Sequence, residues 1–277
     1  MSAPPERDPR PTEAPVAAPE VPVEGVPSGF PAFLRRHRWL DLVALVALTL
    51  VAHAGALLDT EFTYDDVTIV ASDARLELRT PADVGRVLLG SYWGEAFAGE
   101  RLYRPIPRLT YALERTLWGT RPDPAHWVNL LLHLATIALV LDLLRALLRS
   151  RWAALLGAAL FAAQPLHAEA TAGIVGRAEV LGLALTLVAL RLHRWARAHG
   201  DAPRGFALAA FTFLLAFGSK ESALTGPFLL ALLEGAAVGA FARPSLRRAW
   251  PYALYALALG VYFVARLVAL GAITSSS

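Results

Sequence analysis

The chain has 277 residues, of which 56% are hydrophobic, and its formal net charge is only +3. The apolar residues fall in long unbroken runs, which excludes an ordinary soluble domain of this size. The small net charge gives no support for nucleic-acid binding. The absence of cysteine excludes disulfides, thiolate metal sites and cysteine nucleophiles.

The first segment, residues 1–34, is rich in Pro, Ala and Glu and has no apolar periodicity. We expect a disordered cytoplasmic tail there, and a Pro-rich arm that binds a partner is the alternative. A basic stretch, 35–38, then precedes the apolar run 40–58. This order predicts an uncleaved signal anchor with a cytoplasmic N-terminus, and the alternative is a signal peptide cleaved near Ala54.

Residues 59–125 are polar and mixed in charge, and we expect them to form the first extracytoplasmic loop. Thr80 followed by Pro81 predicts a helix that is capped by the threonine and begins at the proline. Short amphipathic helices on the membrane face are expected in this loop, with Tyr92, Trp93 and Trp118 at the interface.

Six further apolar runs follow, at about 126–148, 152–163, up to 192, 206–217, 223–240 and 250–270. Arginines cluster in alternate connections, which predicts that these connections are cytoplasmic. The sequence therefore predicts an all-α polytopic membrane protein with about seven transmembrane helices, in a domain covering 35–277. In a bacterium it would lie in the inner or cell membrane.

Charged groups and imidazoles fall at the extracytoplasmic end of successive predicted spans. His126, Asn129 and His133 are three and four residues apart, so they share one helical face. Solvated loop acids, interfacial pairs, helix-end pairs or interhelical hydrogen bonds would explain each group alone. Together they predict a polar cleft at the outer membrane surface. The members expected to bind substrate or phosphate are Arg104, His126, Asn129, His133, His167, Glu169, Arg177, Glu179, Lys220, Glu221 and Arg266.

Such a cleft suits sugar transfer from a lipid-linked phosphate. Asp65 or Asp66 could act as the base that takes the acceptor proton. Positive charge could stabilise the leaving phosphate, and the candidates for it are Arg104, Arg177, Lys220 and Arg266. Mg²⁺ or Mn²⁺ is a second possibility, with Asp65, Asp66 and Glu169 as ligands. A site in which Asp65 faces His167 and Glu169 would be a stronger metal site.

Six motifs occur in an order that resembles the N-terminal membrane region of the transmembrane and tetratricopeptide-repeat (TMTC-type) O-mannosyltransferases, in the GT-C superfamily. They are Phe62-Thr-Tyr-Asp-Asp66, Tyr103-Arg-Pro-Ile106, His126-x-x-Asn129-x-x-x-His133, Gln164-Pro-Leu-His-Ala-Glu169, Gly176-Arg-Ala-Glu179 and Ser219-Lys-Glu221. The resemblance implies a polyprenyl- or dolichyl-phosphate sugar donor, inversion at the anomeric carbon, and a hydroxyl acceptor on protein or glycan. It also implies that Asp65 and Asp66 match the family's acidic pair.

Gln164 departs from the family, which usually has histidine before the proline, so any role of that imidazole is absent here. The relatives continue with further spans and helical repeats. Two other functions stay open at this point. A transporter or lipid carrier needs charges across the bilayer midplane, and the charges here lie at span ends. A non-catalytic or truncated membrane subunit is the other.

Overall fold

A computed structural model describes residues 39–55, 61–94, 102–238 and 246–271. Within these ranges the regular elements are helices and no strand occurs, so the all-α prediction is confirmed. The predicted tail (1–34) and the basic stretch (35–38) lie outside the described residues.

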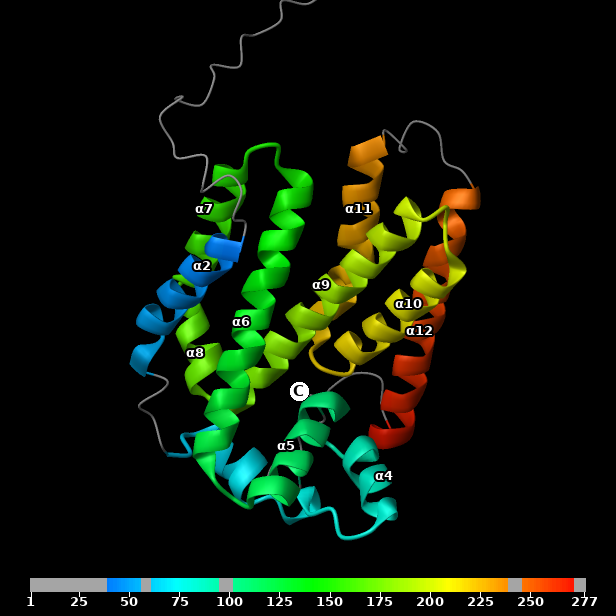
Figure 1. Cartoon of the computed structure of the whole chain (residues 1–277). Coiled ribbons are helices and arrows are strands. Elements are labelled where there is room, and N and C mark those ends of the chain that lie inside the picture. The colour runs from blue at the N-terminus through cyan, green and yellow to red at the C-terminus, as the bar shows by residue number, and fades with distance from the viewer. Residues whose placement is uncertain (1–38, 56–60, 95–101, 239–245, 272–277) are drawn as a thin grey trace, which may run out of the picture. The chain divides into compact units, whose positions relative to one another are not determined.

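Each of the seven predicted apolar runs forms a helix in the described part of the chain (Figure 1). In chain order these helices are α2 (Trp39–Ala52), α6 (Pro122–Leu147), α7 (Arg151–Ala162), α9 (Arg177–Ala198), α10 (Pro203–Phe217), α11 (Gly226–Val238) and α12 (Leu246–Leu270). Successive helices of this set alternate in direction. The chain therefore returns repeatedly to the same two ends of the bundle.

Two helices in the described residues are long and apolar enough to cross a membrane: α6, and α12 from Arg248 to Leu270. A third candidate combines α8 (Leu166–Ala172) with Ile174–Ala198, and these two pieces meet at 110°. The apolar helices α2, α7 and α10 are shorter. Apolar helices thus indicate membrane association, whereas the number of seven spans stays a prediction.

Proline begins several helices, including α4 (Pro81–Leu89) and α5 (Pro105–Trp118). The first N–H groups of a helix have no acceptor within it, so proline loses no hydrogen bond there. At α4 the carboxylate of Asp83 accepts from the Thr80 N–H at 2.6 Å and from the Thr80 hydroxyl at 3.0 Å. The predicted cap and first residue of this helix are confirmed.

One face of α5 is buried and the other is exposed. Tyr111 and Ala112 are buried, whereas Leu113 and Leu117 are 48% and 68% exposed. The expectation that Tyr92 lies at a membrane interface is wrong, because its side chain is only 2% exposed. Its hydroxyl has partners inside the protein, so the ring can be buried without losing its polar contact.

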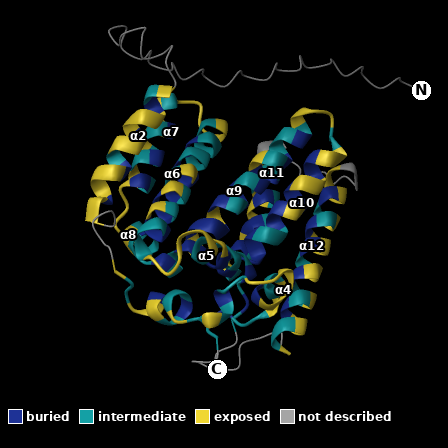
Figure 2. Ribbon diagram, turned by 60° about the horizontal axis from the view of Figure 1, so that its bottom comes forward, coloured by how far each residue is buried: buried dark blue, intermediate teal, exposed yellow. Residues whose placement is uncertain are grey.

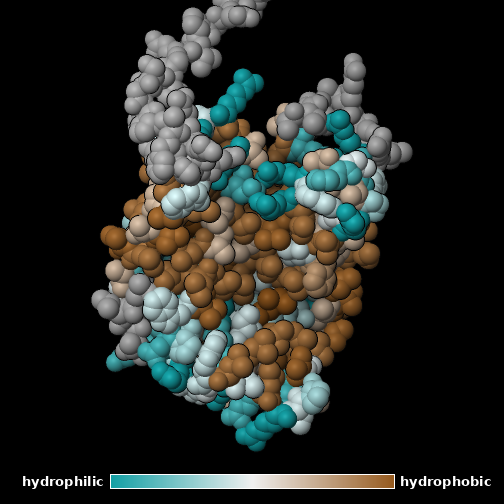
Figure 3. Space-filling view, viewed as in Figure 1, coloured by the Kyte–Doolittle hydropathy of each residue, from teal (hydrophilic) through white to brown (hydrophobic). Residues whose placement is uncertain are grey.

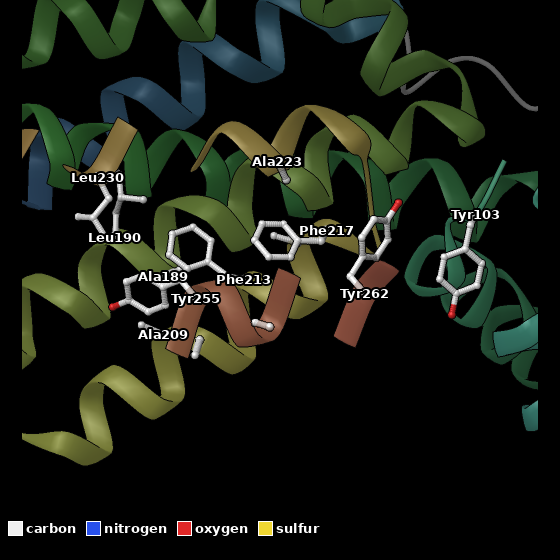
Figure 4. Close-up of a cluster of buried hydrophobic side chains, with 13 residues drawn as sticks. Tyr103, Ala189, Leu190, Ala209, Phe213, Phe217, Ala223, Leu230, Tyr255 and Tyr262 are labelled. Atoms are coloured by element: carbon white, nitrogen blue, oxygen red, sulfur yellow. The ribbon is translucent and has the colours of Figure 1, made fainter. Parts of the chain in front are cut away.

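The bundle is organised around α9, which packs between α6 and α10 (Figures 1 and 2). The largest cluster of buried apolar side chains joins α9 and α10 to α11 and α12, and its buried rings are Tyr103, Phe213, Phe217, Tyr255 and Tyr262 (Figure 4). Gly182 of α9 permits a close approach, since a Cβ there would lie 2.9 Å from the Cβ of Lys220. Such a backbone contact requires glycine.

Polar side chains gather at the two ends of the bundle, and a hydrophobic band lies between them on the face shown in Figure 3. The end with α4 and α5 is called the α5 end below. At the opposite end Asp41 of α2 is buried and accepts from Arg145 of α6 and from Arg151 of α7. The three helices are therefore joined by one carboxylate.

We predict that Asp41→Asn lowers the free energy of unfolding by about 2 kcal/mol, since it leaves two arginines facing each other. The loss is below the value for a fully buried pair, because the side chains of Arg145 and Arg151 are 19% and 20% exposed. Thermal unfolding in lipid nanodiscs measures the change. The control is Asp123→Asn, whose exposed pair with Arg121 contributes less than about 1 kcal/mol. Equal effects of the two substitutions would contradict the prediction.

Candidate active site

Asp66 is fully buried, and both carboxylate oxygens accept hydrogen bonds from the backbone. Oδ1 accepts from the N–H of Val175 at 2.8 Å, and Oδ2 accepts from the N–H of Ile174 at 3.1 Å. Both N–H groups belong to the 3₁₀ turn η3 (Ile174–Gly176), which precedes α9. N–H groups at the start of a helical segment lack internal acceptors. Asp66 therefore ties the stretch that follows α2 to the start of α9.

Asp65 is exposed, and its carboxylate has no hydrogen bond or ion pair with the residues that the structure describes. Tyr64 has φ 43°, in the left-handed region, and is 94% exposed. This conformation costs free energy in a bulky residue, so the surroundings must hold the turn. Thr63 contributes, because its N–H and its hydroxyl each lie 3.4 Å from Oδ2 of Asp66. A fixed turn thus presents the Asp65 carboxylate to solvent.

Asn129 of α6 binds the carbonyl groups of the backbone segment whose N–H groups Asp66 accepts. Its Nδ2 donates to the carbonyls of Gly173 at 2.9 Å and Ile174 at 3.2 Å. Its Oδ1 accepts from Nε of Arg177 at 2.7 Å. Asn129 is fully buried, so it positions the turn and is not available to a ligand.

Arg177 was predicted as a phosphate-binding residue, but its side chain is fully buried. Besides Asn129, it donates to the carbonyl of Ala125 and to the hydroxyl of Thr110, both at 3.0 Å, and to the carboxylate of Glu114. A buried cation needs such partners, because burial without them is costly. Arg177 therefore joins α5, α6 and α9.

Two tyrosines that the sequence analysis did not assign to the site complete this network. The hydroxyl of Tyr111 donates to the carbonyl of Ile174 at 3.3 Å, and that of Tyr92 donates to the carbonyl of Val175 at 3.4 Å. Burial raises the pKa of both hydroxyls, so they stay neutral donors. The guanidinium of Arg104 lies 5.2 Å from the centre of the Tyr92 ring. Tyr92 thus connects η3, which Asp66 holds, to Arg104.

A buried arginine also fixes α4 against α5. Arg108 is fully buried and donates to the carbonyl of Val87 at 2.9 Å, with Asp73 at 3.5 Å. Burial lowers the pKa of Arg108 to about 10. Burial raises the pKa of Asp73, but the hydrogen bonds and charge of Arg75 outweigh this, so the pKa lies below its usual range. A Cβ on Gly90 would lie 2.3 Å from Nη1 of Arg108, so this arginine requires glycine.

The structure brings five of the predicted residues together beside Tyr92. Nε and Nη2 of Arg104 donate to Oε2 of Glu221 at 3.0 and 2.8 Å. Nη1 of Arg266 lies 3.8 Å from Oε1 of Glu221, and Lys220 forms an ion pair with Glu179. We call Arg104, Glu179, Lys220, Glu221 and Arg266 the Glu221 cluster. It joins the ends of α9, α10 and α12 to the start of α5.

The backbone holds this cluster together as well. The N–H of Ile106 donates to the carbonyl of Gly218 at 3.1 Å, which docks the start of α5 on the end of α10. Two sequence motifs, Tyr103–Ile106 and Ser219–Glu221, therefore meet in space.

The predicted histidines lie apart from the Glu221 cluster. Nε2 of His126 lies 3.3 Å from the carbonyl of Glu61. The ring of His133 lies 5.0 Å from the ring of His53 and 5.3 Å from that of His167. His53, which the sequence analysis did not single out, is hydrogen-bonded to the carbonyl of Ala162 in α7 and to the hydroxyl of Thr171 in α8. His53 directly follows the apolar helix α2. An ionisable side chain in such an apolar run was the signal that could have identified it.

The predicted metal ligands do not converge. Both oxygens of Asp66 are occupied by N–H groups, and Glu169 is exposed on α8. No group of three His, Asp or Glu side chains in the described ranges is arranged to bind a metal ion. A Mg²⁺ or Mn²⁺ requirement stays a prediction without a fitting ligand set here, and no chemical step below depends on it.

Comparison with known proteins identifies relatives of the chain. Residues 105–267 match the family model of the dolichyl-phosphate-mannose-protein mannosyltransferases. The protein O-mannosyl-transferase Tmtc2 of Drosophila melanogaster is 37% identical over 62% of this chain and 19% of its own length. TMTC1 of Homo sapiens is 36% identical over 56% of this chain and 18% of its own length.

Tmtc1 of Drosophila melanogaster is 31% identical over 70% of this chain and 23% of its own length. The chain thus spans about a fifth of the length of the curated relatives it matches. No solved structure matched significantly. The family match covers more than half of the residues and confirms the resemblance that the motifs indicated. The chain belongs to the dolichyl-phosphate-mannose-protein mannosyltransferase family, and within it to the TMTC type of the GT-C superfamily.

Proposed function

We propose that the chain acts in protein O-mannosylation, as the membrane part of a glycosyltransferase. It would move a mannose-like sugar from a polyprenyl-phosphate donor to a hydroxyl group on a polypeptide, at the extracytoplasmic membrane surface. The relatives are named protein O-mannosyl-transferases, and the family model carries a dolichyl-phosphate-mannose description.

The observation that carries this proposal is the different environment of two adjacent acids. Asp66 is consumed by two backbone N–H groups, and Asp65 is left exposed on the turn that Asp66 fixes. A general base must reach the proton that it removes, so Asp65 suits this role and Asp66 positions it. The two residues of the predicted acidic pair therefore have different roles: Asp65 is the base and Asp66 is the positioning residue.

In the proposed reaction, the Asp65 carboxylate takes the proton of the acceptor hydroxyl. The hydroxyl oxygen forms a bond to the anomeric carbon from the face opposite the phosphate. The bond from that carbon to the phosphate oxygen breaks, and its electron pair stays on the polyprenyl phosphate. The sugar is inverted at the anomeric carbon, as the family resemblance implies.

The leaving phosphate carries negative charge, and the Glu221 cluster supplies positive charge at the same end of the bundle. Within this cluster, Arg104 is the cation that contacts connect to η3, because its guanidinium lies over the ring of Tyr92, whose hydroxyl donates to the carbonyl of Val175. Arg266 is connected to Arg104 through Glu221, which both arginines face. Lys220 precedes Glu221 in the chain. Arg177, which is enclosed by protein partners, is left out of this role.

The proposed orientation follows from charge. Arginines cluster at the end opposite to α5, in and beside the connections from α6 to α7 and from α9 to α10. Such clusters favour the cytoplasm, and this supports an extracytoplasmic position for the α5 end and Asp65. Seven spans within 35–277 and a cytoplasmic N-terminus belong to this proposal.

Asp65→Asn should lower the rate of sugar transfer by about 10²- to 10⁴-fold, because it removes the base. The melting temperature should not change, since the carboxylate is exposed. The assay measures sugar released from polyprenyl-phosphate mannose by the full chain in nanodiscs, with a Ser/Thr peptide as acceptor. Asp123→Asn, at an exposed acid on α6, is the matched control and should keep its activity. Full activity of Asp65→Asn would overturn this assignment.

Asp66→Asn should act through stability. An amide oxygen replaces only one of the two acceptors, so one buried N–H of η3 loses its partner, at a cost of about 1–3 kcal/mol. Thermal unfolding of the purified variant measures this loss beside Asp65→Asn. A normal melting temperature for Asp66→Asn, with activity lost as in Asp65→Asn, would instead give Asp66 the chemical role.

A further inference from the structure

Asp41 and Glu221 each lie between two arginines, at opposite ends of the bundle, and they differ in their hydrogen bonds. At the end opposite to α5, Oδ1 of Asp41 accepts from Nη2 of Arg151 at 2.6 Å. Oδ2 of Asp41 accepts from Nε of Arg151 at 3.0 Å and from Arg145. Both oxygens of this acid are therefore satisfied.

Glu221 is held less completely. Both donors of Arg104 converge on the same oxygen, Oε2. The second oxygen, Oε1, is buried and accepts no hydrogen bond from the described residues. Arg266 approaches it at 3.8 Å, which is beyond hydrogen-bond distance. A buried charged oxygen without a donor is costly, so Glu221 is a poor occupant of a well-placed pair of arginines.

The charge around Glu221 points in the same direction. Three cations of the Glu221 cluster face two carboxylates, which leaves one net positive charge at a largely enclosed place. The side chain of Arg266 is only 8% exposed and that of Arg104 14% exposed. Glu221 itself is 32% exposed, at the first residue of the 3₁₀ turn η4 (Glu221–Thr225). It therefore has room to turn toward solvent, whereas the arginines do not.

We propose that Glu221 is a built-in stand-in for a lipid phosphate. In the ligand-free chain its carboxylate occupies the place between Arg104 and Arg266 that an anionic phosphate monoester takes on binding. This inference rests on the proposed function, and it adds an exchange of Glu221 for phosphate at the same site.

A phosphate group fits this place better than the carboxylate does. Its non-bridging oxygens can accept both donors of Arg104 separately and still reach toward Arg266. The exchange satisfies the arginines in both states, so neither the empty nor the loaded site leaves an unpaired buried cation. Glu221 also competes with the phosphate that remains after sugar transfer, and its return would help this product to leave.

The first test compares binding of farnesyl phosphate to the wild-type chain and to Glu221→Gln in maltoside micelles, by calorimetry. The amide keeps the shape and removes the competing negative charge, so binding should become at least about tenfold tighter. Asp41→Asn, at an acid that lies between two arginines at the opposite end of the bundle, is the matched control and should not tighten binding. Unchanged or weaker binding by Glu221→Gln, in a variant that keeps its melting temperature, would overturn the proposal.

Two lipids could supply this phosphate, and the same assay separates them. Farnesyl phosphate represents a polyprenyl phosphate, and dioleoyl phosphatidic acid represents a membrane phospholipid. Tightening in Glu221→Gln for the first lipid assigns the site to the donor, and tightening for the second assigns it to a phospholipid headgroup. Farnesol, which lacks the phosphate, should show no difference between the proteins. Equal tightening for farnesol would contradict the proposal.

A second test uses the wild-type chain and does not depend on the folding of a variant. Carbodiimide labelling of Glu221, followed by mass spectrometry, reports how accessible the carboxylate is. Farnesyl phosphate should raise the labelling rate at Glu221 and leave the rate at Asp41 unchanged. An unchanged or lower rate at Glu221, under conditions where calorimetry shows binding, would contradict displacement.

These tests are separable from the proposed reaction. If farnesyl phosphate displaces Glu221 but no sugar is transferred, the phosphate site stands and the enzymatic proposal fails. If Asp65-dependent transfer occurs and Glu221→Gln binds no more tightly, the reaction stands and the stand-in role fails.

Discussion

The α5 end of this protein depends on one buried carboxylate. Asp66 accepts the two N–H groups of η3, and the carbonyls of the same short segment accept from Asn129, Tyr92 and Tyr111. Polar backbone groups at a 110° bend between helical pieces would otherwise lie in the interior without partners. Satisfying them requires side chains from four separate segments, which are the stretch after α2, the stretch after α4, α5 and α6, so these segments and the bend are fixed together.

The proposed catalytic geometry is a consequence of this constraint. The turn at Tyr64, which Asp66 anchors, has a strained backbone and exposes Asp65 to solvent. Tyr92 connects the segment that Asp66 holds to Arg104. The base and the cations that would face a leaving phosphate are therefore parts of one scaffold. At the opposite end, the ion pairs of Asp41 join a different set of helices. Both oxygens of Asp41 accept hydrogen bonds. Among the acids that the structure describes, a buried oxygen without a donor is found at Glu221, where exchange with a ligand is proposed.

Local patterns predicted the helices well and the roles of the polar residues less well. The apolar run at 152–163 corresponds to α7 within one residue at each end, and the cap at Thr80 follows from neighbouring residues alone. The difference between Asp65 and Asp66 could not be predicted, because it arises from N–H groups 108 and 109 positions away. Arg177 was assigned to phosphate for the same reason, since the residues that enclose it lie on two other helices.

The most direct test of this account is amide hydrogen exchange at Ile174 and Val175. If Asp66 holds the turn, both amides exchange slowly in the wild-type chain and in Asp65→Asn, and at least one exchanges much faster in Asp66→Asn. Fast exchange of both amides in the wild type, or slow exchange of both in Asp66→Asn, would contradict the claim that this carboxylate organises the site.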